Sequence, residues 1–203
     1  MNKMLAVGVL VASGMIQQSV CAAADTMYAG AFFGQSTTDA QDLREVIDDG
    51  SFTGGISTDT SDVALGVYFG AKIVPALAVE FAYQNLGSFT AKGTSGSGPV
   101  KGELEASVFS ASFLGMIQPR EEFALFGRLG GYRATTDASS PGFSADTNNV
   151  GLMAGLGGQF SIAHDMFVRL EWTMYQDLEF INRDGNTAEL TVETIGASIA
   201  LTF

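Results

Sequence analysis

Few ionisable side chains in this sequence stand where they could do chemistry away from bulk water. Glu80, Arg169 and Glu171 each interrupt a segment in which apolar and small residues alternate. Burying a charge is costly unless an opposite charge and hydrogen bonds accompany it, so we expect these groups to pair with one another. Such a set could form a salt-bridge network that fills a narrow interior, or it could gate a path for ions.

The sequence carries no pattern typical of an enzyme. His164 is the only histidine, and it stands beside Asp165 where a two-residue turn is expected. A catalytic histidine needs a nucleophile and a cleft beside it, which such a turn does not supply. The sequence also lacks Ser/His/Asp and Cys/His sets, a Gly-rich phosphate loop and zinc-ligand spacing. We therefore predict that the protein is not an enzyme and has no catalytic residue, cofactor or metal.

Acidic residues dominate the charge of the chain. It has 22 Asp and Glu against 10 Lys and Arg, a formal net charge of −12, which argues against nucleic acid as a partner. One acidic run could bind Ca²⁺ or bridge to lipopolysaccharide through divalent ions, but it lacks EF-hand spacing, and a solvated surface loop is the favoured interpretation. The run consists of Asp39, Asp42, Glu45, Asp48 and Asp49, with Arg44 among them.

The first residues have the order of a secretory signal. A short basic start precedes an apolar run over residues 4–16, which is too short to cross a bilayer as a helix, and small residues follow. We predict a signal peptide over residues 1–24, with cleavage after Ala24 or alternatively after Ala23. Cys21, the only cysteine, would leave with it, and the protein would be exported through the periplasm.

Eight segments of the remaining chain, residues 25–203, have the character of strands. In five of them apolar and polar side chains alternate, as they do along strands, whereas residues 103–117 sort less cleanly. Within residues 61–73, for example, Val63, Leu65 and Val67 share a face, whereas Lys72 falls on the other. Each segment has about the length that a tilted strand needs to cross a membrane. The segments are 26–36, 61–73, 76–89, 103–117, 123–135, 149–163, 166–180 and 188–203. They predict an all-β fold, an eight-stranded antiparallel up-and-down transmembrane β-barrel.

The connections between these segments fall into two classes. Short links are expected at 74–76, 118–122 and 164–165, and longer loops at 37–60, 90–102, 136–148 and 181–187. Short turns at one end and long loops at the other are typical of outer-membrane barrels, whose turns lie in the periplasm. Apolar residues at helical spacing within 40–47 also predict a helical turn in the first loop.

Alternation alone does not decide which face lies inside. A soluble lipocalin-type barrel would turn the apolar face inward. The polar faces here are rich in Gly and Ala with few charges, which suits a narrow lumen, and the chain ends on Phe203 at the tip of an amphipathic strand. These features favour a membrane barrel with its apolar face toward lipid.

Several short stretches, in order along the chain, resemble the OmpA-like transmembrane domain and the small OmpA/OmpX-like barrels more broadly. They are residues 25–31, 65–70 with 75–83 and Leu86-Gly87, 127–131, and 169–172. Glu80 matches the carboxylate of that family's interior gate and Arg169 its arginine, and Arg128 and Glu171 match other inward charges.

The sequence also departs from the family's pattern. The gate lysine and second carboxylate fall at Phe113 and Gln159, and an inward lysine of the first strand falls at Phe32. The resemblance therefore implies an incomplete gate, in which a structural salt-bridge network of Glu80 and Arg169 with the other two charges is favoured over a switch. The peptidoglycan-binding domain of the family is not expected.

We therefore expect an integral protein of the bacterial cell outer membrane with a structural or surface-interaction (adhesin-like) role. A low-conductance pore for small solutes or ions is the alternative. Expected partners are the lipid bilayer, lipopolysaccharide, the barrel assembly machinery, for which Phe203 would be the C-terminal assembly signal, and an extracellular ligand of the loops. Eight aromatic residues are expected to face lipid or form interfacial girdles. They are Phe69, Tyr83, Phe89, Phe123, Tyr132, Phe160, Trp172 and Phe203.

Overall fold

The computed structural model describes residues 27–40, 43, 57–95, 98–140, 143–181 and 187–203. These residues form nine antiparallel strands in one sheet. The strands are β1 (Met27–Thr38), β2 (Ser57–Asp59), β3 (Ser61–Val74), β4 (Leu77–Ser95), β5 (Gly98–Arg120), β6 (Phe123–Ser140), β7 (Phe143–Ala163), β8 (Met166–Ile181) and β9 (Thr187–Thr202).

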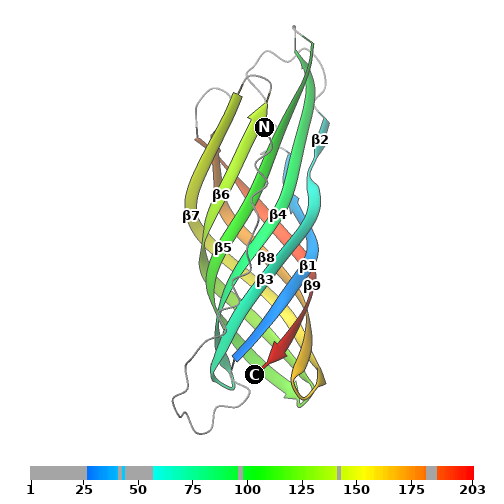
Figure 1. Cartoon of the computed structure of the whole chain (residues 1–203), viewed down its shortest axis with the longest axis vertical. Helices are drawn as coiled ribbons and strands as arrows, with labels where there is room; N and C mark the ends of the chain where they lie inside the picture. Colours follow the sequence, from blue (N-terminus) through cyan, green and yellow to red (C-terminus); the bar gives the residue numbers. More distant parts are fainter. Residues whose placement is uncertain (1–26, 41–42, 44–56, 96–97, 141–142, 182–186) are drawn as a thin grey trace, which may run out of the picture.

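Eight of these strands close into a ring, as predicted. β1 pairs with both β3 and β9, and β4 pairs with β5, so each strand of the ring has a neighbour on either side, while short β2 pairs with the upper part of β4. The three expected short turns lie at the lower end of Figure 1, at Pro75-Ala76, Glu121-Glu122 and His164-Asp165. The carboxyl end lies there too, because the Phe203 backbone N–H donates to the Met27 carbonyl at 2.9 Å.

Near the turns, the outer face of the ring is apolar and the inner face is mixed. The outward residues have 43–70% of their surface exposed; they include Phe69, Phe113, Leu129, Leu156 and Leu170. Inward residues there are mostly polar, small or aromatic, with Leu114 and Met116 as larger aliphatic side chains. An apolar band around a ring with no open strand edge is what a bilayer requires of a β protein.

Beyond this band the strands continue further than predicted. The expected loops at 90–102 and 136–148 are wrong in part, because β4 runs to Ser95, β5 starts at Gly98, β6 runs to Ser140 and β7 starts at Phe143. Figure 1 shows these strands rising at the end opposite the turns. We call this part the extension; it comprises residues 87–95, 98–108, 132–140, 143–152, 176–181 and 187–192.

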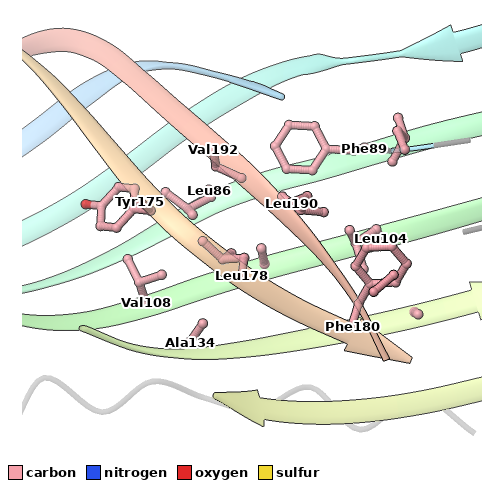
Figure 2. Close-up of a cluster of buried hydrophobic side chains, with 14 of the residues drawn as sticks. Leu86, Phe89, Leu104, Val108, Ala134, Tyr175, Leu178, Phe180, Leu190 and Val192 are labelled. Atoms are coloured by element: carbon pink, nitrogen blue, oxygen red, sulfur yellow. The ribbon is translucent and has the colours of Figure 1, made fainter. Parts of the chain in front are cut away.

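In the extension the polarity of the wall is inverted. The outer face carries charges such as Glu105, Asp137 and Glu189, while the inner face is apolar. We call the inward cluster the upper core (Figure 2). It is built from Leu43, Leu86, Phe89, Ala91, Leu104, Ala106, Val108, Tyr132, Ala134, Ala138, Met153, Tyr175, Leu178, Phe180, Ala188, Leu190 and Val192. A strand with water outside needs its apolar side chains inside, so the extension packs as a soluble β-sheet does.

Two bulges change which residues face inward. In β4 the pairing shifts between Asn85 and Gly87, and Gly87 has a φ of 83°; even-numbered residues face inward below this bulge and Phe89 and Ala91 above it. In β8 the pairing shifts between Tyr175 and Leu178, next to Asp177 with a φ of 59°. A bulge adds an unpaired residue and so reverses the alternation beyond it.

The predicted aromatic girdle is therefore only partly present. Phe89 and Tyr132 were expected to face lipid, and both expectations are wrong, because the two side chains lie in the upper core at 0% and 4% exposure. Phe69, Tyr83, Phe160 and Phe203 are exposed. Phe123 and Trp172 are half-buried.

The first predicted loop contributes one side chain to the upper core. The Leu43 backbone N–H donates to the Asp39 carbonyl at 3.2 Å, the spacing of a helical turn, and Leu43 is fully buried. The other residues of the acidic run, 42 and 44–49, lie outside the described residues.

Candidate functional site

Four charged side chains meet inside the ring, in the part enclosed by the apolar band. Glu80 comes from β4, Arg128 from β6, and Arg169 and Glu171 from β8, and none is more than 6% exposed. They point inward because each occupies an inward position of the strand alternation. Glycine makes room beside them: Gly70 pairs with Glu80, and a Cβ at Gly70 would overlap the Tyr28 ring.

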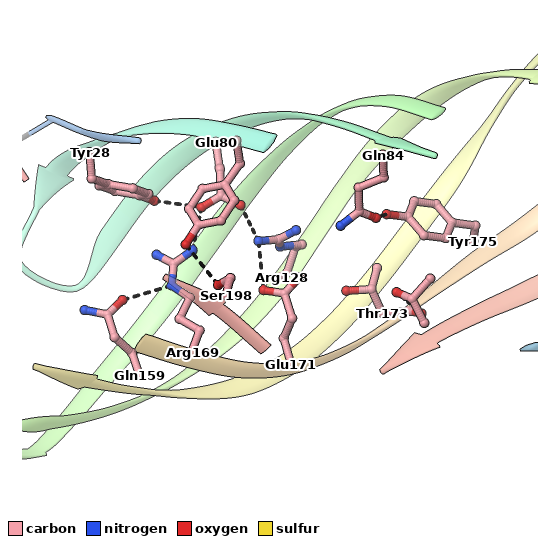
Figure 3. A network of polar contacts seen from close by, with 12 residues as sticks. Tyr28, Glu80, Gln84, Arg128, Gln159, Arg169, Glu171, Thr173, Tyr175 and Ser198 are labelled. Atoms are coloured by element: carbon pink, nitrogen blue, oxygen red, sulfur yellow. Dashed lines mark hydrogen bonds and ion pairs between the residues drawn. The ribbon is translucent and has the colours of Figure 1, made fainter. Parts of the chain in front are cut away.

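The four charges are joined by ion pairs in one layer (Figure 3). Arg169 Nη1 lies 2.7 Å from Glu80 Oε2, and Arg128 Nη2 pairs with Glu80 Oε1 and lies 3.3 Å from Glu171 Oε2. Two arginines and two glutamates give the layer no net charge. We call these four residues the charge layer.

Neutral partners complete the layer. The Tyr28 hydroxyl donates to Glu80 Oε2 at 3.0 Å, and Arg169 Nε donates to Gln159 Oε1 at 3.0 Å. Further toward the extension, the Tyr175 hydroxyl donates to Gln84 Oε1. Buried charges are tolerated when ionic partners and hydrogen bonds replace water, and most polar atoms here have such a partner.

Arg169 is also surrounded by aromatic rings. Its guanidinium carbon lies 4.8–5.2 Å from the centres of four rings, which belong to Tyr28, Tyr68, Phe126 and Phe167. A cation over a ring face is attracted by the ring's electron density, more strongly when water is excluded. The rings therefore hold Arg169 in place and also fill the lumen toward the turns.

The sequence reveals most of this site but not all of it. Glu80, Arg128, Arg169 and Glu171 lie together, and Gln159 and Phe32 face inward where the resemblance put them. Phe113 does not: it points outward with 59% exposure, so the equated family position is wrong, and its neighbours Ser112 and Leu114 face the lumen instead.

The aromatic partners of Arg169 were not predicted, although the alternation could have found two of them. Tyr28 and Tyr68 stand on the same faces as the small inward residues of β1 and β3. His164 lies in its turn at the far end from the extension. No group of three or more His, Cys, Asp or Glu able to hold a metal ion occurs among the described residues.

A closed ring of eight antiparallel strands with an apolar outer band and a charged, filled lumen defines a small outer membrane β-barrel. The model of the OmpA-like transmembrane domain matches residues 22–203, and the chain belongs to this family. It is therefore an integral protein of the outer membrane. Among the described residues, no helix has the length and apolar character needed to cross a bilayer.

Solved structures with the same fold are similar at low sequence identity. The attachment invasion locus protein Ail of Yersinia pestis has a TM-score of 0.53 at 14% identity, covering 89% of this chain and 100% of that one. Neisserial surface protein A has a TM-score of 0.57 at 10% identity, covering 90% and 100%. The N-terminal barrel of Pseudomonas aeruginosa OprF has a TM-score of 0.55 at 8% identity, covering 89% and 100%. No curated protein matches this chain in sequence.

Proposed function

We propose that this protein is a closed outer membrane barrel with a structural or surface-interaction role, and that it is neither a pore nor an enzyme. The observation that carries the proposal is the filling of the lumen by two successive layers. The charge layer and its aromatic rings fill it within the bilayer, and the upper core fills it within the extension.

The upper core is the stronger of the two barriers. Ions cross apolar constrictions poorly because they must shed water without replacement, and the upper core offers them buried Leu, Phe, Val and Ala side chains. The charge layer alone would leave room for a gate, since an arginine could exchange one carboxylate for the other. A low-conductance pore therefore stays the alternative, supported by the ion pairs of Arg128 with both Glu80 and Glu171.

The extension supports the surface-interaction role. It carries parts of six strands, β4 to β9, beyond the apolar band and displays their outer face to the medium, which a purely structural barrel does not need. Ail has been solved in complex with the heparin analogue sucrose octasulfate, a polyanion. The extension of this protein is acidic instead, and its described basic residues are Lys92, Lys101 and Arg133. We therefore propose that its extracellular ligand is positively charged.

Conductance in a planar bilayer tests the closed lumen. We expect no steady current steps from refolded wild-type protein, and none from Arg169→Ala, because the upper core remains in both. Lys101→Ala, which changes an exposed charge on the outer wall, serves as the matched control. Resolvable steps in the wild type that change in Arg169→Ala but not in Lys101→Ala would establish the pore instead. Heat-modifiable migration on a gel verifies that each variant is folded.

The remaining proposals concern export and assembly. We propose that residues 1–24 are a signal peptide, that residues 25–203 form the mature barrel, and that Phe203 is read by the barrel assembly machinery. The exposure of Phe203, at 61%, supports this last role. Lipopolysaccharide is the proposed neighbour of the outer wall. Mass spectrometry of protein from the outer membrane would locate the first mature residue.

A further inference from the structure

The wall of the extension is not closed between β7 and β8. β7 pairs with β8 only from Met153 to Ala163, so among the described residues 143–152 of β7 have β6 as their one strand neighbour. The pairing of β7 with β8 ends at Tyr175, where the bulge next to Asp177 begins. Beyond the bulge, Leu178 and Phe180 lie in the upper core.

The two edges created by this separation differ. Three backbone carbonyl groups of β8 accept hydrogen bonds from side chains of β6 and β7, so the edge of β8 is occupied. The bonds run from Tyr132 Oη to Gln176 O, from Asn149 Nδ2 to Asp177 O (2.6 Å) and from Thr136 Oγ1 to Glu179 O (2.8 Å). The edge of β7 has no such backbone partners among the described residues.

A groove of about 370 Å³ lies along this open edge. It is lined by Arg133 of β6, Asn148, Asn149 and Val150 of β7, and Glu179 of β8. Asn149 is only 8% exposed, and its Oδ1 has no hydrogen-bond partner among the described atoms. A buried acceptor without a donor costs free energy, and a ligand that brings a donor into the groove would remove this cost.

We propose that the open edge of β7, residues 143–152, binds an extended basic segment of a partner protein as an added strand. Alternate residues of an edge strand direct their N–H and C=O groups away from the sheet, and a partner strand satisfies them. The partner's backbone also supplies a donor near Asn149 Oδ1. This inference rests on the proposed surface-interaction function and names the class of ligand.

The charges beside the edge select a basic partner. Asp146 on β7 stands directly opposite Asp137 on β6, which in turn stands opposite Glu105 on β5, and Glu179 lies across the groove. Arg133 is the basic residue of the groove. Pairing of this edge with a second copy of the chain would bring two acidic edges together, which like-charge repulsion opposes. Lysine or arginine side chains on an incoming strand would instead be attracted by these acidic residues.

A peptide titration tests the proposal on the refolded barrel in detergent micelles. The probe is a fluorescein-labelled nonapeptide in which lysine alternates with threonine and valine, followed by fluorescence anisotropy. Two further peptides separate the contributions: one carries glutamate in place of lysine, and one has alternate backbone nitrogens methylated so that they cannot donate. We expect saturable binding of the lysine peptide, and binding at least about tenfold weaker for the other two, since each loses one whole class of contact.

Two charge reversals localise the binding. Glu179→Lys at the groove should weaken binding of the lysine peptide about fivefold or more, whereas Glu122→Lys in the turn at the opposite end should leave it unchanged. Hydrogen exchange should slow at alternate amides of residues 143–152 when the peptide binds.

Equal binding of the methylated peptide, equal effects of the two reversals, or no binding would each overturn the proposal. So would concentration-dependent dimerisation through this edge. None of these results bears on conductance, which tests the closed lumen separately.

Discussion

The charge layer makes a quantitative prediction about the coupling between Glu80 and Arg169. Replacing Arg169 by Met leaves the layer with one excess negative charge, and replacing Glu80 by Gln leaves one excess positive charge. The double variant is neutral again and keeps the pair of Arg128 and Glu171 at 3.3 Å. The two substitutions together should therefore cost much less than the sum of their separate costs.

The size of this coupling follows from distance and burial. At 2.7 Å and an effective dielectric constant of about 20, two unit charges attract by about 6 kcal/mol, before the cost of removing them from water is subtracted. Removal of one partner from a buried pair typically costs about 3–5 kcal/mol. Because Glu80 keeps Arg128 and Tyr28 when Arg169 is lost, we expect a coupling energy of about 3 kcal/mol.

Equilibrium unfolding in urea, followed by fluorescence, measures this coupling in a double-mutant cycle. Trp172 is the only tryptophan and lies on the outer face of β8, so it reports on the loss of the barrel wall. The matched control is the exposed pair of Lys101 and Glu103 at 2.9 Å, changed to Met and Gln, for which less than about 1 kcal/mol is expected. A coupling between Glu80 and Arg169 no larger than that of the control would refute the argument that burial gives the charge layer its strength.

Two further predictions concern the extension. Gly87→Ala should lower the free energy of unfolding by about 1–3 kcal/mol, because Gly87 has a φ of 83° and the new Cβ would overlap Asp62. Gly115→Ala, whose Cβ would meet open space, should not lower it. Urea midpoints that fall equally in the two variants would contradict this prediction. A hydrogen bond with Asp146, partial burial and nearby negative charges raise the pKa of Asp137, so the folded state binds the proton more tightly than the unfolded state. The stability that this pair contributes is therefore present at low pH and is lost as the pH rises through the raised pKa. Asp137→Asn should raise the melting temperature at pH 7 but not at pH 3. An equal rise at both pH values would show that protonation of Asp137 is not involved.

The sequence predicts the part of the barrel that lies in the bilayer well, because there one physical rule holds along each strand. Residues that face lipid must be apolar, and narrow lumens take small or paired polar groups, so alternation reveals both the strands and the inward charges Glu80, Arg169 and Glu171. The same rule predicts short links at 74–76 and 164–165, and the structure has two-residue turns at Pro75-Ala76 and His164-Asp165. The charge layer follows from these placements together with the cost of burying an unpaired charge.

The extension escapes prediction because the rule reverses beyond the bilayer. In β5 the inward residues include Ser110 and Ser112 between Leu104 and Leu114, and the outward residues change from Phe113 to Glu105, so no single face of this strand is apolar throughout. A mixed pattern of this kind is easily read as a loop. Bulges add a second difficulty: Phe89 would face outward by the alternation of lower β4, and only the bulge at Gly87 turns it into the upper core.

This reversal also explains how a chain with a net charge of −12 can have a mean hydropathy of +0.22. The apolar surface serves two separate purposes, the outer band within the bilayer and the upper core above it, while the acidic side chains described in the extension all stay outside that core. The open edge of β7 belongs to the acidic wall of the extension, so an extended basic segment that approaches the edge meets side chains of opposite charge.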